Sequence, residues 1–296
     1  MHTEDFDARY HDLDAQSDDE IIGLIFDAQA VGLAATRTAT AAIAAAASAL
    51  ANRLRSSVTG RLIYAGAGTS GRLGVLDGAE LIPTFGWPAE RGGFLIAGGL
   101  DALVKPIEGA EDDASAGTTE TQALKLGADD AVIAISASGT TPYTLAVCEA
   151  ARADGALTIG VANNAPCPLL DAAEHPIAVL SGAEPIGGST RMTAGTVQKV
   201  TLNLLSTLTM IRLNRTYGGY MVDVLLTNDK LKARAVRMIC EITTVDADAA
   251  RAALATAGDN TKLAILIAKG VALDDANALL ARHDGNLRRA LAATAG

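Results

Sequence analysis

The sequence predicts an α/β fold, a parallel sheet flanked by helices, followed by a small helical C-terminal domain. Two units along the chain have the order strand, loop of small residues, helix, and a further strand follows the second unit. Strands that alternate with helices imply a parallel sheet with helices on both faces. The chain has 296 residues, of which 49% are hydrophobic and 20% charged, so it can bury a sizeable core.

The first segment, residues 18–56, is predicted to be helical, because Asp18 and Asp19 can cap a stretch dominated by Ala and Leu. Its uncharged part, residues 39–51, is too short and too weakly apolar to span a bilayer. The acidic N-terminus lacks the apolar region of a signal peptide. We therefore expect a soluble, cytoplasmic protein.

The first unit begins with a predicted strand at residues 61–65, a short apolar run. The turn GAGTSG follows at residues 66–71. A helix is expected over residues 72–81, and Pro83 is expected to end it.

The second unit has the same order. A strand is predicted at residues 131–135 and a helix at residues 143–153, with the loop SASGTTP between them. A further strand is predicted at residues 157–161. Apolar positions at helical spacing then predict a long, largely buried helix over residues 195–215.

After about Arg237 only helices are expected. Three short ones are predicted, with glycines near their breaks, at residues 239–257, 261–269 and 274–283. This divides the chain into an N-terminal helical segment, a sheet domain and a small three-helix C-terminal domain, at residues 1–56, 57–237 and 238–296.

Charge and composition exclude several classes of partner. The chain has 24 Lys and Arg against 34 Asp and Glu, a net charge of −10. Nucleic acid and anionic membranes need a basic face, so neither is expected as the main partner. The three Cys form no CxxC pair and the four His are scattered, so no metal site is expected.

Two loops have the composition of anion sites. A glycine- and hydroxyl-rich loop that enters a helix offers backbone N–H groups, hydroxyls and the positive end of the helix dipole. GAGTSG at 66–71 fits, and so does the SxSGxT pattern of Ser136, Ser138, Gly139 and Thr141. Neither is a Walker loop, and either could be an ordinary tight turn. Two such loops in equivalent places favour phosphate binding.

A third stretch, residues 184–199, also opens a helix. Arg191 supplies a cation that can fork onto a phosphate or a carboxylate. Glu184 can bind sugar hydroxyls. The alternative for the stretch is an ordinary helix cap, and the alternative for Glu184 is a solvated charge.

Two carboxylates are candidates for acid–base chemistry. Glu80 stands on an otherwise apolar predicted helix, and Glu111 stands in the acidic cluster EGAEDD. Spacing gives neither a catalytic role, since most Glu residues are surface charges.

Five segments of the sequence resemble those of a known family, and this resemblance says more about function than residue spacing does. They are YAGAGTSGRLGVLDGAELIPTFG, IAGGLDAL with EGAEDD, SASGTTPY, GSTRMTAGTVQK and YGGYMVDVLLTNDKLKARAVRMI. From about Thr3 to Ala292 the chain resembles the N-acetylmuramic acid 6-phosphate etherase family. The resemblance implies the sugar isomerase fold, a flavodoxin-like three-layer sandwich that binds phosphosugars. It also implies a homodimer with sites near the subunit interface and no cofactor.

The resemblance implies a reaction in peptidoglycan recycling. The family removes D-lactate from C3 of N-acetylmuramic acid 6-phosphate and leaves N-acetylglucosamine 6-phosphate. A base takes the C2 proton, an acid helps the C3 ether leave as lactate, and water adds at C3. The resemblance gives the proton donor as Glu80, whose apolar helix would raise its pKa, and the base as Glu111.

The same matching implies the substrate contacts. The phosphate is expected on Ser136, Ser138, Gly139, Thr140 and Thr141. Thr69, Ser70, Gly71 and Arg72 are expected to line the site. Glu184, Ser189, Thr190 and Arg191 are expected to contact sugar or lactate. Glu80 lies about 13 Å along the helix from Gly71, at 1.5 Å per residue. Either the phosphate lies on the other loop, or a second subunit completes the site.

The sequence departs from the family pattern at three places. The family's N-terminal TExRN-like word reads TEDFDAR at residues 3–9, which is a poor match. Thr193 stands where the family usually has Lys, and Pro185 follows Glu184. The missing Lys bears on how the protein binds an anionic substrate.

Two other functions share this fold. A non-catalytic phosphosugar-sensing regulator of a sugar kinase has the same sequence words, but such proteins are larger, with two sugar isomerase domains. A phosphosugar isomerase uses the same C2 proton transfer and does not need EGAEDD or GSTR. The length and the presence of both Glu80 and Glu111 favour the etherase.

Overall fold

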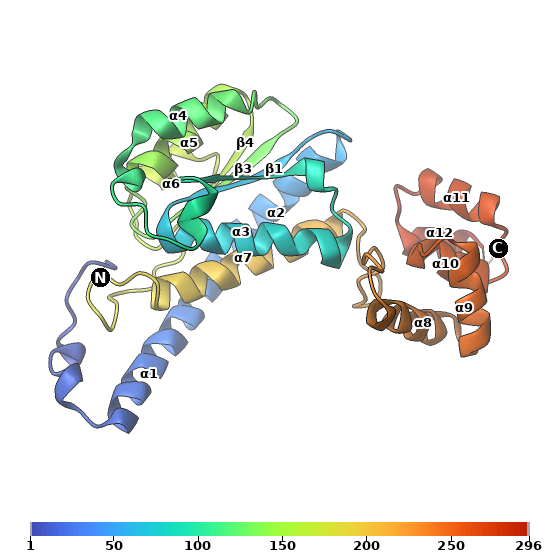
Figure 1. Ribbon diagram of the computed structural model, residues 1–296, viewed down its shortest axis with the longest axis horizontal. Helices are drawn as coiled ribbons and strands as arrows, with labels where there is room; N and C mark the ends of the chain where they lie inside the picture. The colour runs from blue at the N-terminus through green and yellow to red at the C-terminus, as the bar shows by residue number, and fades with distance from the viewer. Residues whose placement is uncertain (1, 295–296) are drawn as a thin grey trace. The chain divides into compact units, whose positions relative to one another are not determined.

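The computed structural model describes residues 2–294 and confirms the predicted fold class. A parallel five-stranded sheet has the order β2-β1-β3-β4-β5 (Figure 1). Its strands are β1 (Leu62–Gly66), β2 (Gly92–Ile96), β3 (Ala131–Ser136), β4 (Leu157–Ala162) and β5 (His175–Ala178). β1, β3 and β4 are buried along their whole length, as expected of strands covered on both faces.

Helices cover both faces of the sheet, which makes three layers (Figure 1). On one face lie α4 (Ala114–Ala123), α5 (Pro142–Ala153) and α6 (Pro168–Ala172). On the other lie α2 (Thr40–Arg55), α3 (Gly68–Phe85) and α7 (Thr193–Arg212). Buried Asp77 of α3 ties this second face together, because its carboxylate accepts hydrogen bonds from Tyr64 of β1 (2.8 Å) and Asn203 of α7 (2.6 Å).

The predicted strands agree with β1, β3 and β4 to within one residue. β2 and β5 are not among the predicted strands. β2 begins with two glycines, and β5 has only four residues, one of them a proline. Both lie at edges of the sheet, where residues of low strand propensity are tolerated.

Helix α3 begins at Gly68, inside the turn predicted for residues 66–71, and it also runs on past the residue predicted to end it. Pro83 lies inside the last turn, and the helix reaches Phe85. The helix ends at Gly86, whose left-handed φ of 60° lets its N–H bond the carbonyl of Ile82 (3.0 Å). A proline in the last turn removes one hydrogen bond without breaking a helix that a following glycine caps.

The N-terminal helical segment is two helices rather than one. α1 (Asp18–Thr36) begins at a capping box formed by Ser17 and Glu20. A 3₁₀ turn, η3 (Arg37–Ala39), separates it from α2. Five further short 3₁₀ helices are η1 (Ala8–Tyr10), η2 (Leu13–Ala15), η4 (Ala89–Arg91), η5 (Leu100–Leu103) and η6 (Ala110–Asp112).

Among residues 2–294, one helical stretch, Asp18–Arg55, has the length and apolar composition to cross a membrane. Buried helices of other proteins pass the same test, and 33% of its most apolar window is buried here. The stretch is therefore weak support for a membrane contact.

The chain forms two compact units. The first comprises Met1–Ala79 and Glu90–Thr209, and the second comprises Glu80–Ala89 and Met210–Gly296. The three domains expected from the sequence divide the chain at other positions and stay a prediction.

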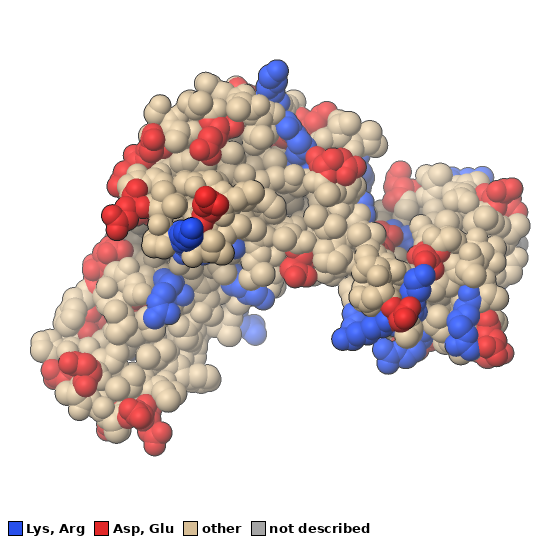
Figure 2. Space-filling view, in the orientation of Figure 1, with Lys and Arg blue, Asp and Glu red and all other residues tan. Residues whose placement is uncertain are grey.

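The C-terminal part of the second unit has five helices within the described residues, not the predicted three. They are α8 (Asp229–Thr243), α9 (Ala247–Thr256), α10 (Thr261–Ala268), α11 (Leu273–Arg282) and α12 (Leu287–Ala293). The predicted helix 239–257 is interrupted at Thr244, which adopts a left-handed φ of 66°. Figure 2 shows Lys and Arg side chains gathered on α8.

Asp130, just before β3, is hydrogen-bonded to Arg61, just before β1, and so helps to hold these two strands together. It accepts hydrogen bonds from the backbone N–H of Arg61 (2.8 Å), the Arg61 guanidinium and the N–H of Gly127. Burial acts to raise the pKa of Asp130, but these hydrogen bonds outweigh it, and the pKa falls below its ordinary 3.8. The ionised carboxylate therefore stabilises the fold above pH 3.8, and this contribution is lost as the pH falls further.

We expect Asp130→Asn to lower the free energy of unfolding at pH 7 by about 1–3 kcal/mol. It should also flatten the loss of stability in acid, measured by urea unfolding at a series of pH values. The exposed neighbour Asp129, changed to Asn, is the control. Equal acid dependence in Asp130→Asn and the wild type would contradict this.

Candidate active site

The site lies where the order of the strands reverses. β1 is followed in sequence by its neighbour on one side, β2, and then by its neighbour on the other, β3. The register pairs Gly66 with Ile135, so the loops that follow β1 and β3 emerge side by side. Each loop leads into a helix, α3 or α5, at the carboxyl edge of the sheet. Open α/β sheets bind ligands at such a switch point.

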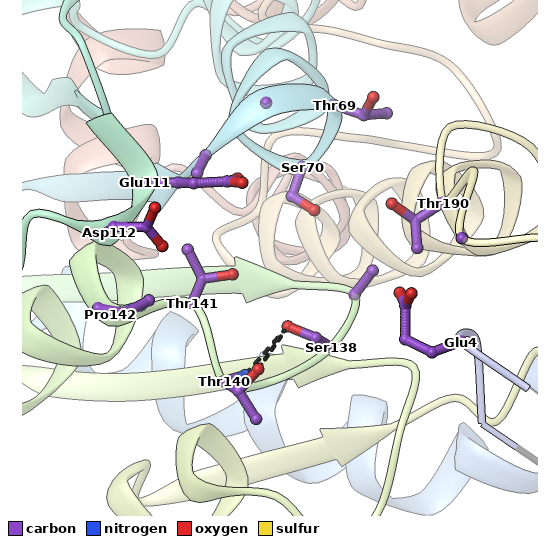
Figure 3. Close-up of a pocket in the computed structure, with 14 residues that line it drawn as sticks. Glu4, Thr69, Ser70, Glu111, Asp112, Ser138, Thr140, Thr141, Pro142 and Thr190 are labelled. Atoms are coloured by element: carbon purple, nitrogen blue, oxygen red, sulfur yellow. Dashed lines mark hydrogen bonds between the residues drawn. The ribbon is translucent and has the colours of Figure 1, made fainter. Parts of the chain in front are cut away.

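A pocket of about 360 Å³ opens there, within the first unit (Figure 3). Both glycine- and serine-rich loops line it, together with the turn that carries Glu111, the loop before α7 and the N-terminal segment. The lining residues are Glu4, Ala67, Gly68, Thr69, Ser70, Glu111, Asp112, Ala137, Ser138, Thr140, Thr141, Pro142, Gly188 and Thr190.

The loop after β3 is held in shape by its own hydroxyl groups. The buried Ser136 hydroxyl accepts the N–H of Gly139 (3.0 Å) and lies 2.8 Å from the Thr141 hydroxyl. Ser138 accepts hydrogen bonds from both the N–H and the hydroxyl of Thr140. The loop ends at α5, whose first turn presents N–H groups and the positive end of its dipole. The start of α5 is therefore suited to bind an anion such as a phosphate.

Gly139 cannot carry a side chain in this loop. Its φ is +74°, and a Cβ would clash with the sulfur of the buried Cys167. Of the residues expected to hold phosphate, Ser138, Thr140 and Thr141 line the pocket, while Ser136 and Gly139 lie buried behind them.

The first turn of α3, which directly follows β1, contributes Thr69 and Ser70 to the pocket. Ser70 is buried, and its hydroxyl donates to Gln198 of α7 (3.0 Å). Gln198 in turn donates to Asn163, in the loop after β4 (2.9 Å). This buried chain of amides fixes the hydroxyl that faces the pocket.

Two expected residues of α3, Gly71 and Arg72, do not line the pocket. Gly71 is buried against the carbonyl of Gly66. The Nε of Arg72 donates to the carbonyls of Ala102 (3.0 Å) and Leu103 (3.1 Å), so its guanidinium supports η5.

Only part of the stretch 184–191 lines the pocket. Thr190 does, with Gly188 beside it. Glu184 is buried and accepts the N–H groups of Thr193 and Ala194, both at 2.8 Å, as the cap of α7. Ser189 and the exposed Arg191 are not lining residues. Glu184 is therefore occupied as a helix cap, and it is not the solvated charge that was its alternative.

The two candidate carboxylates are placed differently. Glu111 is exposed on η6 and points into the pocket beside Asp112 (Figure 3). Glu80 is also exposed, so the apolar enclosure expected around it is missing, and it does not line the pocket. Glu80 belongs to the second unit, whereas every residue that lines the pocket belongs to the first.

None of the lining residues is Lys, Arg or His, whereas Glu4, Glu111 and Asp112 are acidic. Thr193, at the position of the family's Lys, is fully buried against Gly32 of α1. Hydroxyls and N–H groups are thus the donors that the lining offers to an anion. Residues 2–294 contain no group of three or more His, Cys, Asp or Glu arranged to hold a metal ion.

The sequence does not point to Glu4 as a lining residue. The only available signal is the N-terminal word TEDFDAR, whose first two residues match the family's pattern. The rest of that word departs from the pattern, so it directs no attention to Glu4.

Comparison with known proteins gives family matches over the sheet region. The Glucokinase regulatory protein N-terminal SIS domain matches residues 42–152, and the SIS domain matches residues 112–208. A phosphoheptose isomerase from Francisella tularensis has a TM-score of 0.49 at 18% identity, covering 67% of this chain and 98% of that one.

Two curated relatives match nearly the whole chain. An N-acetylmuramic acid 6-phosphate etherase of Deinococcus radiodurans is 47% identical over 290 residues, covering 98% of this chain and 94% of that protein. The protein of the same name from Streptomyces avermitilis is 47% identical over 293 residues, covering 98% and 93%.

Gly139→Ala tests the loop that follows β3. The added methyl group must displace Cys167 or the loop, so we expect the affinity for inorganic phosphate to fall at least tenfold, by about 1.4 kcal/mol or more. Calorimetric titration measures this. Gly127→Ala is the control, because a Cβ there meets nothing within 4 Å. Unchanged phosphate affinity in Gly139→Ala would show that phosphate does not bind this loop.

Proposed function

The chain belongs to the N-acetylmuramic acid 6-phosphate etherase family, and from this premise we propose that it is itself such an etherase. It would convert N-acetylmuramic acid 6-phosphate and water into N-acetylglucosamine 6-phosphate and D-lactate. This makes it a carbon–oxygen lyase of peptidoglycan recycling, acting in the cytoplasm on a small phosphosugar. The reaction changes no oxidation state overall, and acid–base groups suffice for it.

One observation carries the proposal beyond family likeness. A loop suited to phosphate and the carboxylate of Glu111 line the same pocket, which has the volume for one phosphosugar. Ser138, Thr140 and Thr141 would hold the phosphate at the start of α5. Thr69, Ser70 and Thr190 would face the sugar.

The chemistry begins with the open-chain aldehyde, which acidifies the proton on C2. Glu111 takes this proton as a carboxylate, and the electron pair forms the C2–C3 double bond as the C3–O bond to lactate breaks. An acid protonates the departing lactate oxygen. Water then adds at C3 and a proton returns to C2, which gives the product aldehyde.

The proposed acid, Glu80, does not line the pocket of its own chain. We infer a homodimer in which each pocket receives Glu80 from the partner chain. Contact with the partner would also enclose the Glu80 side chain, which is exposed in one chain. A twofold dimer would hold two such shared sites.

The match to the Glucokinase regulatory protein N-terminal SIS domain favours one other candidate, a non-catalytic phosphosugar sensor. A sensor would bind the phosphosugar and release no lactate. A phosphosugar isomerase would exchange the C2 proton and also release no lactate.

Lactate release by the wild type, Glu111→Gln and Glu80→Gln tests the proposal, with N-acetylmuramic acid 6-phosphate in deuterated water. We expect both variants to lose about 100- to 10,000-fold in rate, the usual contribution of a general acid or base. Glu80→Gln should still exchange the C2 proton, and Glu111→Gln should not.

Glu149→Gln, an exposed change outside the pocket, is the control and should keep full activity. A wild type that binds the phosphosugar without releasing lactate would contradict the etherase. It would favour the sensor, or the isomerase if the C2 proton exchanges.

A further inference from the structure

Two hydrogen bonds between Thr3 and Asn164, here called the clamp, hold the N-terminal segment to the loop that follows β4. Thr3 is fully buried, and its backbone N–H donates to Oδ1 of Asn164 (2.9 Å). The Nδ2 of the same amide donates back to the Thr3 hydroxyl (3.0 Å). Asn164 is itself buried and follows Asn163, which holds the amide chain to Ser70. Neighbouring asparagines thus fix two walls of one pocket.

The clamp sets the position of the next residue, Glu4. Its carboxylate lines the pocket across from Glu111 and points toward Thr190 (Figure 3). Its Oε2 lies 3.2 Å from where a Cβ would stand on Gly188, so the glycine leaves room for it. Within residues 2–294 this carboxylate has no hydrogen-bond or ion-pair partner, although the residue before it is firmly held.

We propose that Glu4 is a substrate-binding residue whose carboxylate accepts hydrogen bonds from the hydroxyl groups of the sugar. The inference rests on the proposed function and goes beyond it, because the residues expected to bind substrate do not include Glu4. A carboxylate accepts hydrogen bonds and donates none, so it complements the donors of a sugar.

The charge of Glu4 also orients the ligand. Glu4 is exposed, so water and salt screen its charge in part, but the repulsion still disfavours a phosphate or the lactyl carboxylate next to it. The phosphate is then left to the loop at α5, and the neutral hydroxyl groups of the sugar are turned toward Glu4. Glu4 is therefore a specificity residue of the pocket.

Two ligands separate this role from a purely structural one. For N-acetylglucosamine 6-phosphate, Glu4→Ala should weaken binding about 10- to 100-fold, the usual effect of losing hydrogen bonds to a charged group. For inorganic phosphate, which has no sugar hydroxyls, the affinity should stay the same or rise. Glu4→Gln, which keeps an acceptor oxygen, should lie between wild type and Glu4→Ala.

Two further variants complete the titration series. Asp5→Asn removes the same charge one residue away, outside the pocket lining, and should change neither affinity. Thr3→Val removes the hydroxyl that Asn164 holds, so it should weaken phosphosugar binding less than Glu4→Ala does.

Three results would overturn the proposal. Phosphosugar binding as tight as or tighter than wild type in Glu4→Ala would mean that the carboxylate only repels the ligand. Equal loss for phosphosugar and phosphate would mean that Glu4 only supports the loops. A wild type that binds no phosphosugar would contradict both this proposal and the proposed function, whereas binding without lactate release would contradict the proposed function alone.

Discussion

The parallel pairing of β1 with β3 is the constraint on which the site depends. It places Gly66 beside Ile135, so two chemically similar loops leave the sheet at one edge and open two helices there. The pocket, its hydroxyl groups and the N-terminus of α5 all follow from that register. The acidic turn at Glu111 and the N-terminal segment at Glu4 then add carboxylates to a site that the sheet has already formed.

Local signals in the sequence predict much of this arrangement. Apolar runs locate β1, β3 and β4, and small residues after two of them locate both loops. What escapes prediction depends on distant contacts. Glu184 looks like a sugar ligand until α7 begins nine residues later and uses it as a cap. Glu4 looks unremarkable until Asn164, 160 positions away, anchors its neighbour Thr3. The break between α1 and α2 likewise has no Gly or Pro to mark it.

The proposed ligand is an anion, yet three of the residues that line the pocket are acidic. Under the proposed function, an anionic phosphosugar binds among three carboxylates, and none of the described lining residues is Lys, Arg or His. The N–H groups at α5 and the hydroxyls that Ser136 organises offer neutral donors at one end of the pocket, where we propose that the phosphate binds. In this proposal the carboxylates serve the sugar hydroxyl groups and proton transfer. Separating these roles in space lets one small pocket provide both a phosphate site and a carboxylate for proton transfer.

The central claim is that each pocket combines Glu111 of one chain with Glu80 of another. Co-expressing Glu80→Ala and Glu111→Ala chains with different tags, and purifying the mixed dimer, tests it most directly. A shared site predicts about half of wild-type lactate release, because one of the two pockets in a twofold mixed dimer keeps both carboxylates. A mixed dimer no more active than either variant alone, or the failure of the two chains to associate, would contradict the account.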